Sequence, residues 1–229
     1  MKIGIILTPD VRSKAYIQKS IKHNIHFENI ILMNDNRKEQ IFLPEVTKLS
    51  EKMGFNISET VKNTLDKKNI SYNEFPFVDI NDPKLVNYLK NLDVDYWIFS
   101  GGGILKNEIL SLKTKFIHLH PGIVPDYRGS TCFYYSILNE NYAGVTSFIM
   151  SKGLDMGDII FQKRFDKPNY QYLDEIYDPH IRSETLIELL KNETLLEKEK
   201  MVQNSNEGET YFIIHPVLKH IAIQKCLND

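Results

Sequence analysis

Short apolar runs separated by amphipathic, helix-length stretches are the feature that most constrains the fold of this chain. The runs have the length of buried strands and lie at residues 3–7, 28–33, 96–99 and 115–120. Between them, residues 11–23 and 83–92 carry helical patterns, and Asn81-Asp82-Pro83 is a helix start signal for the second. The alternation predicts an α/β fold, with helices on both faces of a mostly parallel, twisted sheet.

The segments between these runs have less regular patterns. Residues 44–68 are expected to be mostly helical with a break near Gly54, residues 69–78 an edge strand and residues 106–111 a short helix. Further along the chain, 129–139 is a predicted helix, and two more predicted strands follow at 144–150 and 158–165.

The composition changes after residue 165, where the regular alternation stops. We expect a helix over 173–191, a polar loop over 193–209, a strand over 211–214 and a helix over 216–227. The domain prediction is therefore a catalytic core over residues 1–165, with a short C-terminal α+β extension over 166–229 that packs on the same domain.

Charge and cysteine content exclude several classes of protein. The chain has 28 basic and 30 acidic residues, and this balance argues against a broad nucleic-acid surface. Cys132 and Cys226 form no paired motif, which favours a reducing compartment. The apolar start over residues 1–7 is too short for a signal peptide or a membrane span, so we expect a soluble cytoplasmic protein.

Two histidines end the apolar run at 115–120, and a loop rich in proline and glycine follows. In a strand His118 and His120 share one face, with Cα atoms roughly 6–7 Å apart. Ligands of open α/β sheets bind beyond the carboxyl ends of strands, where His120 would lie. Further along, Asp155 is a lone carboxylate in a segment bounded by Gly153 and Gly157. Together these residues predict a proton-transfer site.

Other interpretations of the same residues stay open. A buried histidine is often a hydrogen-bonded core residue, and an aspartate near glycines is common in turns. His-x-His at a strand end can also begin a metal site, with Asp155 as a third ligand to His118 and His120, as in a metal-dependent amide hydrolase. Because no clear fourth ligand lies nearby, we predict no metal.

Three motifs resemble those of one known family. Residues 120–129, His-Pro-Gly-Ile-Val-Pro-Asp-Tyr-Arg-Gly, resemble the HPSLLPxYRG loop of the 10-formyltetrahydrofolate-dependent formyltransferases. Residues 144–147 with 153–160 are similar to the family's GVT and LDxGxII block, and 102–105 to its G-x-I-L folate loop. The family includes methionyl-tRNA, glycinamide ribonucleotide and amino-sugar N-formyltransferases. The resemblance covers about residues 95–165 well.

The resemblance implies a Rossmann-like formyltransferase fold, a 10-formyltetrahydrofolate co-substrate and three catalytic positions. His120 and Asp155 match the family's proton-shuttling histidine and its aspartate partner. The third position, an asparagine that hydrogen-bonds the formyl oxygen, holds His118 instead. An imidazole N–H can also donate to a developing oxyanion, but with a pH dependence that an amide lacks. A protein that keeps the fold but lacks activity is therefore a further alternative.

The resemblance also assigns two sets of binding residues. The co-substrate set comprises Gly102, Gly103, Ile104, Leu105, Gly153 and Leu154, with the glycines admitting a flat pterin close to the backbone. The acceptor set comprises Pro121, Gly122, Tyr127, Arg128 and Arg182. For Arg128 a solvated surface position is the simpler alternative to an anion contact.

The acceptor is predicted by elimination among the family's substrates. Residues after 165 are not basic and are few for the further nucleic-acid-binding domain of methionyl-tRNA formyltransferase, so we expect no nucleic acid partner. Thr8-Pro9-Asp10 replaces the Gly-Ser-Gly phosphate loop of the glycinamide ribonucleotide enzyme. A small amine remains, with a nucleotide-linked amino sugar as the preferred acceptor and an amino acid side chain as the alternative. The oligomeric state is left open, a homodimer included.

Overall fold

The computed structural model describes residues 1–229 except 36–37, 193, 205 and 229. The chain forms two compact units, Met1–His118 and Leu119–Asp229. Strand β5 (Lys115–His120) begins in the first unit and ends in the second. The division of the chain at residue 165 remains a prediction.

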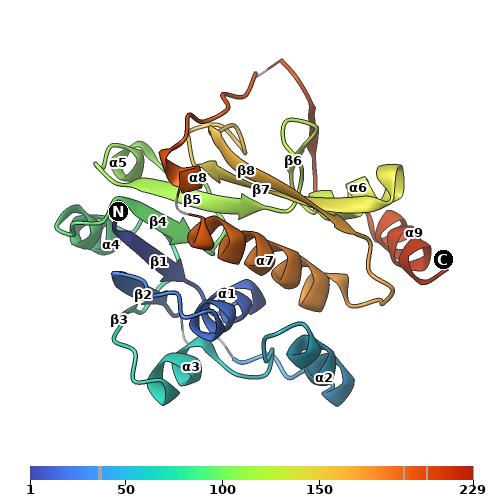
Figure 1. The fold of residues 1–229 in the computed structure, drawn as a ribbon, viewed down its shortest axis with the longest axis horizontal. Helices are drawn as coiled ribbons and strands as arrows, with labels where there is room; N and C mark the ends of the chain where they lie inside the picture. Colours follow the sequence, from blue (N-terminus) through green and yellow to red (C-terminus); the bar gives the residue numbers. More distant parts are fainter. Residues whose placement is uncertain (36–37, 193, 205, 229) are drawn as a thin grey trace. The chain divides into compact units, whose positions relative to one another are not determined.

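The first unit is built on parallel strands (Figure 1). They run in the order β3-β2-β1-β4-β5, and each neighbouring pair is parallel. β1 is buried on both faces, because Ile5, Ile6 and Leu7 have no exposed surface. The expected mostly parallel α/β fold is thus confirmed. The strands before β5 are β1 (Ile3–Leu7), β2 (Asn29–Met33), β3 (Asn73–Phe75) and β4 (Tyr96–Phe99).

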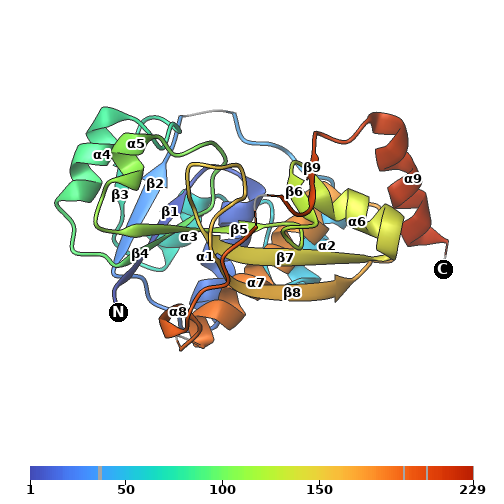
Figure 2. The ribbon, with the colours of Figure 1, turned by 90° about the horizontal axis from the view of Figure 1, so that it is seen from above.

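Helices of the first unit lie on both sides of these strands. In Figures 1 and 2, α1 and α3 lie together on one side, away from α4 and α5. Side chains cap three of the helix starts: Asp10 accepts from the backbone of Ser13, Thr60 from Asn63 and Asp82 from Lys84. The helices are α1 (Val11–Lys22), α2 (Pro44–Lys52), α3 (Val61–Lys67), α4 (Pro83–Lys90) and α5 (Asn107–Leu110).

The break predicted near Gly54 within 44–68 is confirmed, because Gly54 takes a positive φ of 90° just after α2 and the next helix, α3, begins after its cap Thr60. One prediction in the first unit needs correction. The edge strand expected over 69–78 is only the three residues of β3, which pair with the end of β2.

The second unit contains the antiparallel hairpin β7 (Tyr142–Ile149) and β8 (Ile159–Asp166). Helix α7 (Asp178–Lys191) packs against both strands and follows a π-helical turn, η1 (Leu173–Tyr177). Helices α6 (Cys132–Glu140) and α9 (Pro216–Leu227) lie side by side in Figures 1 and 2. A short helix, α8 (Thr194–Glu197), lies within the segment expected to be a loop.

A second, two-stranded sheet was not expected. It joins β6 (Tyr127–Gly129) to β9 (Glu209–Tyr211) in parallel, with Tyr127 opposite Glu209 and Gly129 opposite Tyr211. The strand predicted over 211–214 therefore lies earlier, and part of the predicted loop after β5 is a strand. Three-residue strands are too short for an alternation pattern, so only their pairing partner defines them.

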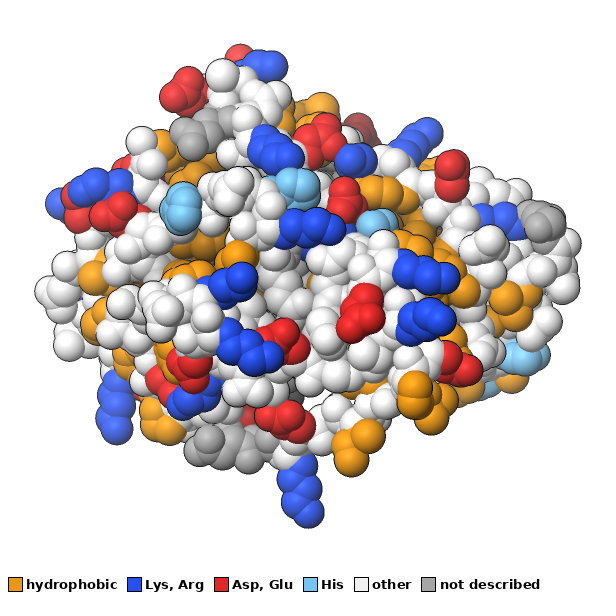
Figure 3. All heavy atoms as spheres, turned by 60° about the horizontal axis from the view of Figure 1, so that its bottom comes forward, with side chains coloured by type: hydrophobic (Ala, Val, Ile, Leu, Met, Phe, Trp, Pro, Cys, Tyr) orange, Lys and Arg blue, Asp and Glu red, His pale blue; other side chains and the backbone are white. Residues whose placement is uncertain are grey.

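The surface of the molecule carries charges of both signs. Basic and acidic side chains are interspersed on the face drawn in Figure 3, as the balanced composition predicts. No helix among the described residues is long and apolar enough to cross a membrane.

Candidate active site

His120 lies at the end of β5 and is almost completely buried, with 2% of its surface exposed. Its Nε2 atom is 2.8 Å from the carbonyl oxygen of Tyr127. Because a carbonyl oxygen only accepts hydrogen bonds, Nε2 carries a hydrogen in this arrangement. The other ring nitrogen, Nδ1, lies 3.3 Å from Oδ2 of Asp155. The two predicted proton-transfer residues are therefore in contact.

Asp155 lies in the loop between β7 and β8 and takes a left-handed backbone conformation, with φ of 51°. Aspartate is one of the few residues other than glycine that tolerate this region. Its Oδ2 atom accepts the backbone N–H of Gly129 at 2.8 Å. The side chain is 12% exposed, so it is the more accessible member of the pair.

Two opposing effects determine the pKa of His120 in this pair. Burial lowers the pKa of the His120 imidazole, because the charged form loses its hydration. The Asp155 carboxylate and the Tyr127 carbonyl oppose this by stabilising the imidazolium form, whereas nearby Arg182 adds to the lowering. The net direction is downward, so the buried imidazole gives up a proton more readily than an exposed one.

The loop after His120 is held by side chains from the β7–β8 hairpin. Thr146 donates through Oγ1 to the carbonyl of Gly122 at 2.7 Å and accepts the N–H of Val124 at 3.2 Å. Gln162 donates to the carbonyl of Val124 at 2.7 Å. At Gly122 an added Cβ would lie 2.5 Å from the Tyr127 carbonyl and 2.8 Å from His120 Nε2. Only glycine therefore allows the loop to pass against the imidazole.

The residues predicted to bind the acceptor are mostly buried within the second unit. Pro121, Gly122 and Tyr127 are buried, and Tyr127 donates its hydroxyl to Glu140 at 2.5 Å. Arg182 pairs with Asp178 at 2.6 Å and donates to the carbonyl of Leu119 at 2.8 Å. Their acceptor role remains a prediction, and in this structure these hydrogen bonds hold the framework around β5.

Arg128 is also buried, with 4% exposed surface, rather than solvated on the surface. Its guanidinium donates to the side chain of Gln203 and to the carbonyls of Asn204 and Glu207. These three partners lie in one segment of the C-terminal region.

His118 is the last residue of the first unit and stands two residues before His120 in the same strand. Its Nδ1 atom lies 3.3 Å from the carbonyl oxygen of Phe99, at the end of β4. A hydrogen bond to that carbonyl requires the hydrogen on Nδ1, and then Nε2 donates only in the imidazolium form. Any donation by Nε2 of His118 therefore depends on protonation, unlike donation by an asparagine amide.

The predicted co-substrate loop lies in the first unit and exposes its backbone. Gly102 and Gly103 are exposed, Gly103 has φ of 116°, and no atom lies within 4 Å of a Cβ added at either. Ile104 is 65% exposed, whereas Leu105 is buried and anchors the loop. Asn81 bridges the loop by donating to the carbonyl of Ile104 at 3.0 Å and accepting the N–H of Lys106 at 2.8 Å. In the second unit, Gly153 and Leu154 are exposed.

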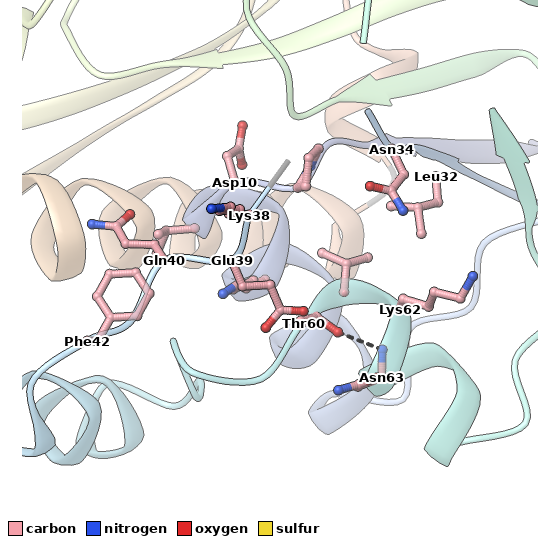
Figure 4. Close-up of a pocket in the computed structure, with 14 residues that line it drawn as sticks. Asp10, Leu32, Asn34, Lys38, Glu39, Gln40, Phe42, Thr60, Lys62 and Asn63 are labelled. Atoms are coloured by element: carbon pink, nitrogen blue, oxygen red, sulfur yellow. Dashed lines mark hydrogen bonds between the residues drawn. The ribbon is translucent and has the colours of Figure 1, made fainter. Parts of the chain in front are cut away.

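A separate pocket of about 500 Å³ lies in the first unit, beyond the carboxyl ends of β1 and β2 (Figure 4). Lys14 enters it from α1, donates to the carbonyl of Ile57 at 2.7 Å and lies 5.4 Å from the centre of the Phe42 ring. Both basic and acidic side chains line it, among them the neighbours Lys38 and Glu39. None of the predicted site residues lines this pocket.

Metal ligation was the main alternative for His118, His120 and Asp155. In the part of the chain that the structure describes, no group of three or more His, Cys, Asp or Glu side chains is arranged to hold a metal ion.

The fold and the site together describe an α/β protein with a buried histidine in contact with a carboxylate at a strand end. A family model described as "Formyl transferase" matches residues 22–179, more than half of the chain. The chain therefore belongs to the formyl transferase family, and it is an enzyme of folate-dependent formyl transfer. The family, the enzyme class and the folate co-substrate expected from the sequence are confirmed.

The relatives and solved structures that this chain resembles include methionyl-tRNA and sugar N-formyltransferases. A methionyl-tRNA formyltransferase from Clostridioides difficile is 28% identical over 237 residues, covering all of this chain and 71% of that protein. A sugar N-formyltransferase from Shewanella has a TM-score of 0.63 at 16% identity, over 99% of this chain and 88% of that one. An N-formyltransferase from Helicobacter canadensis was crystallised with folinic acid and dTDP-3-aminofucose. It has a TM-score of 0.62 at 16% identity, covering 99% of this chain and 80% of that one.

Several residues that build the site were not found from the sequence. Thr146 was part of a recognised motif, but its two bonds to the loop after His120 were not expected. The sequence did not identify Gln162 or Gln203 as site residues, because a single glutamine forms no motif and no periodic pattern. Hydrogen bonds between residues that are distant in the sequence form only when folding brings their segments together.

Proposed function

We propose that this chain transfers the formyl group of 10-formyltetrahydrofolate to the primary amine of a small, nucleotide-linked amino sugar. The amine nitrogen attacks the formyl carbon, the bond from that carbon to folate N10 breaks, and a proton passes from the amine to N10. The observation that carries the proposal is the contact of His120 with Asp155, a carboxylate held by the Gly129 N–H.

In this reaction the pair holds the proton that the amine loses. Both ring nitrogens of His120 face acceptors, Tyr127 O and Asp155 Oδ2, so only the imidazolium form satisfies both. Asp155 is more exposed than the buried imidazole. The proton therefore reaches His120 through the carboxylate and returns by the same path to N10. Burial, which lowers the pKa of His120, favours its release.

His118 takes the place of the amide that binds the formyl oxygen. With Nδ1 bonded to the Phe99 carbonyl, its Nε2 donates to the developing oxyanion in the imidazolium form. One such donor contributes roughly 3 kcal/mol to transition-state stabilisation.

Support for an amino-sugar acceptor comes from the structural neighbours, which include sugar N-formyltransferases whose fold this chain shares. A second candidate is a methionyl-tRNA acceptor, favoured by the relative from Clostridioides difficile. The balanced charge of the chain supports the small amine, because tRNA binding depends on neutralising phosphates.

The test is an assay of the purified chain with 10-formyltetrahydrofolate and two acceptors, a dTDP-linked amino sugar and methionyl-tRNA, with mass spectrometry of the products. We expect formylation of the sugar amine and none of the tRNA. Formylation of the tRNA alone would replace the first candidate by the second. If neither acceptor is formylated, and 5-formyltetrahydrofolate fails to bind at millimolar concentration, the proposal is wrong.

A further inference from the structure

A segment of the C-terminal region contacts both the Asp155 loop and strand β6. We call its described residues, 201–204 and 206–211, the clasp. At its start, Met201 and Ile159 exchange backbone hydrogen bonds of 2.9 and 3.1 Å, next to the β7–β8 loop. At its end, β9 pairs with β6, the strand that carries Gly129. The clasp thus contacts both segments that fix Asp155.

Gln203 connects the clasp to the Asp155 loop directly. Its Nε2 atom donates to the carbonyl of Asp155 at 2.9 Å and to the carbonyl of Gly157 at 2.6 Å. Both hydrogens of the amide are therefore used on the backbone of the left-handed turn. This turn is the conformation that aims the Asp155 carboxylate at His120.

Arg128 holds the other end of the same amide. Oε1 of Gln203 accepts Nε and Nη2 of Arg128 at 3.2 and 3.1 Å. The guanidinium is itself fixed by the carbonyls of Asn204 at 3.1 Å and Glu207 at 2.6 Å. The Gln203 amide cannot rotate without losing two bonds at each end.

Strand β6 joins this network to the catalytic pair through three consecutive residues. The Tyr127 carbonyl binds His120, the Arg128 side chain binds Gln203, and the Gly129 N–H binds Asp155. At Gly129 the strands approach so closely that an added Cβ would lie 2.1 Å from the Tyr211 carbonyl. The position of β6, and with it the catalytic pair, is therefore tied to the clasp.

We propose that Gln203, fixed by Arg128, is a positioning residue that orients the Asp155 carboxylate toward His120. The inference rests on the proposed formyl transfer for its kinetic readout, but its structural readout is independent of any activity. In this proposal Arg128 supports the loop that carries Asp155, and it does not bind the acceptor. Small displacements of a catalytic group are costly, so loss of this support lowers the rate of the chemical step.

The test is Gln203→Glu, which keeps the shape of the side chain and the contact with Arg128. A carboxylate cannot donate, so it repels the carbonyls of Asp155 and Gly157. We expect kcat to fall roughly 10- to 100-fold, while KM for 10-formyltetrahydrofolate changes by less than about threefold. Gln224→Ala on the exposed side of α9 is the matched control and should leave kcat unchanged.

A second arm tests whether the effect passes through Arg128. Arg128→Lys loses the two-pronged contact, so it should lower kcat by a similar factor. The double variant with Gln203→Glu should then fall by less than the product of the two single effects. A double variant whose losses multiply would overturn the assignment of Arg128.

A third arm uses amide hydrogen exchange and needs no substrate. In Gln203→Glu the Gly129 amide, which binds Asp155, should exchange at least about tenfold faster, whereas the Val124 amide, which binds Thr146, keeps its rate. Equal acceleration of both amides, or none at Gly129, would overturn the proposal. If the wild-type chain shows no formyl transfer, only the proposed function fails, and the exchange result still decides the role of Gln203.

Discussion

Gly129 donates its backbone N–H to Oδ2 of Asp155 at 2.8 Å, and the same oxygen lies 3.3 Å from His120 Nδ1. One of these donors is a backbone group that never titrates, and the other is an imidazole that does. The carboxylate therefore keeps its orientation when the imidazole loses its proton. The proposed proton relay needs this property, because the group that passes a proton must stay in place between the two steps.

Removing the charge of Asp155 without changing its shape tests the relay. Asparagine tolerates the left-handed backbone at this position and can still accept the Gly129 N–H, so Asp155→Asn should melt within a few degrees of the wild type. We expect kcat to fall roughly 10²- to 10⁴-fold, the range for loss of a general acid–base group. Steady-state kinetics and a thermal melt check both, and a fall of less than about fivefold would remove Asp155 from the mechanism.

The pH profile of the rate tests the role of His118. If Nε2 donates only as imidazolium, activity should decline as the pH is raised and the ring loses its proton. His118→Asn supplies an amide donor without a proton to lose, so this decline should disappear and the rate at pH 8 should exceed that of the wild type. Profiles of kcat/KM from pH 5.5 to 9 decide this, and identical profiles for the two proteins would contradict the assignment.

His120 should make the fold sensitive to acid. Its pKa is lowered in the folded state by burial, so the unfolded chain binds a proton that the folded chain does not. The stability that neutral His120 contributes is present above the unfolded pKa of about 6.5 and is lost as pH falls, by at most about 1.4 kcal/mol per unit. Urea unfolding at pH 7.5 and 5.5 measures the loss.

The matched variant for this experiment is His120→Gln, whose amide can donate to the Tyr127 carbonyl but does not titrate. All other histidines are common to both proteins, so the difference between their pH dependences belongs to position 120. We expect the variant to lose less stability than the wild type on acidification. If both proteins lose the same stability, the pKa of His120 does not fall when the chain folds.

Cys132 should react slowly with alkylating reagents in the folded protein. Burial raises the pKa of its thiol to about 12, so little thiolate exists at neutral pH, and the residue lies in the second unit beside Gly122. Mass mapping after iodoacetamide treatment should show labelling at least about 100-fold slower than in urea. Rapid labelling of Cys132 at pH 8 in the folded protein would contradict this burial.

The sequence alone was sufficient for the longer helices and strands and for the order of the motifs. Strand β1, strand β4 and strand β5 lie where apolar runs predicted them, because a run of apolar residues must be buried wherever it folds. The helix start at Asp82 also follows from local chemistry, since a cap and its helix are neighbours in the chain. His120 and Asp155 were identified for the same reason, as members of short motifs.

Only the tertiary structure decided how these residues are supported. The bonds from Gly129 and from Gln203 to Asp155 join positions 26 and 48 residues apart, and Arg128 reaches Gln203 across 75 residues. Neither β6 nor β9 has a pattern of its own, because three residues define a strand only through their partner. A single glutamine or carbonyl carries no periodicity and no motif. Its role arises when folding places it within about 3 Å of a group that needs a hydrogen bond.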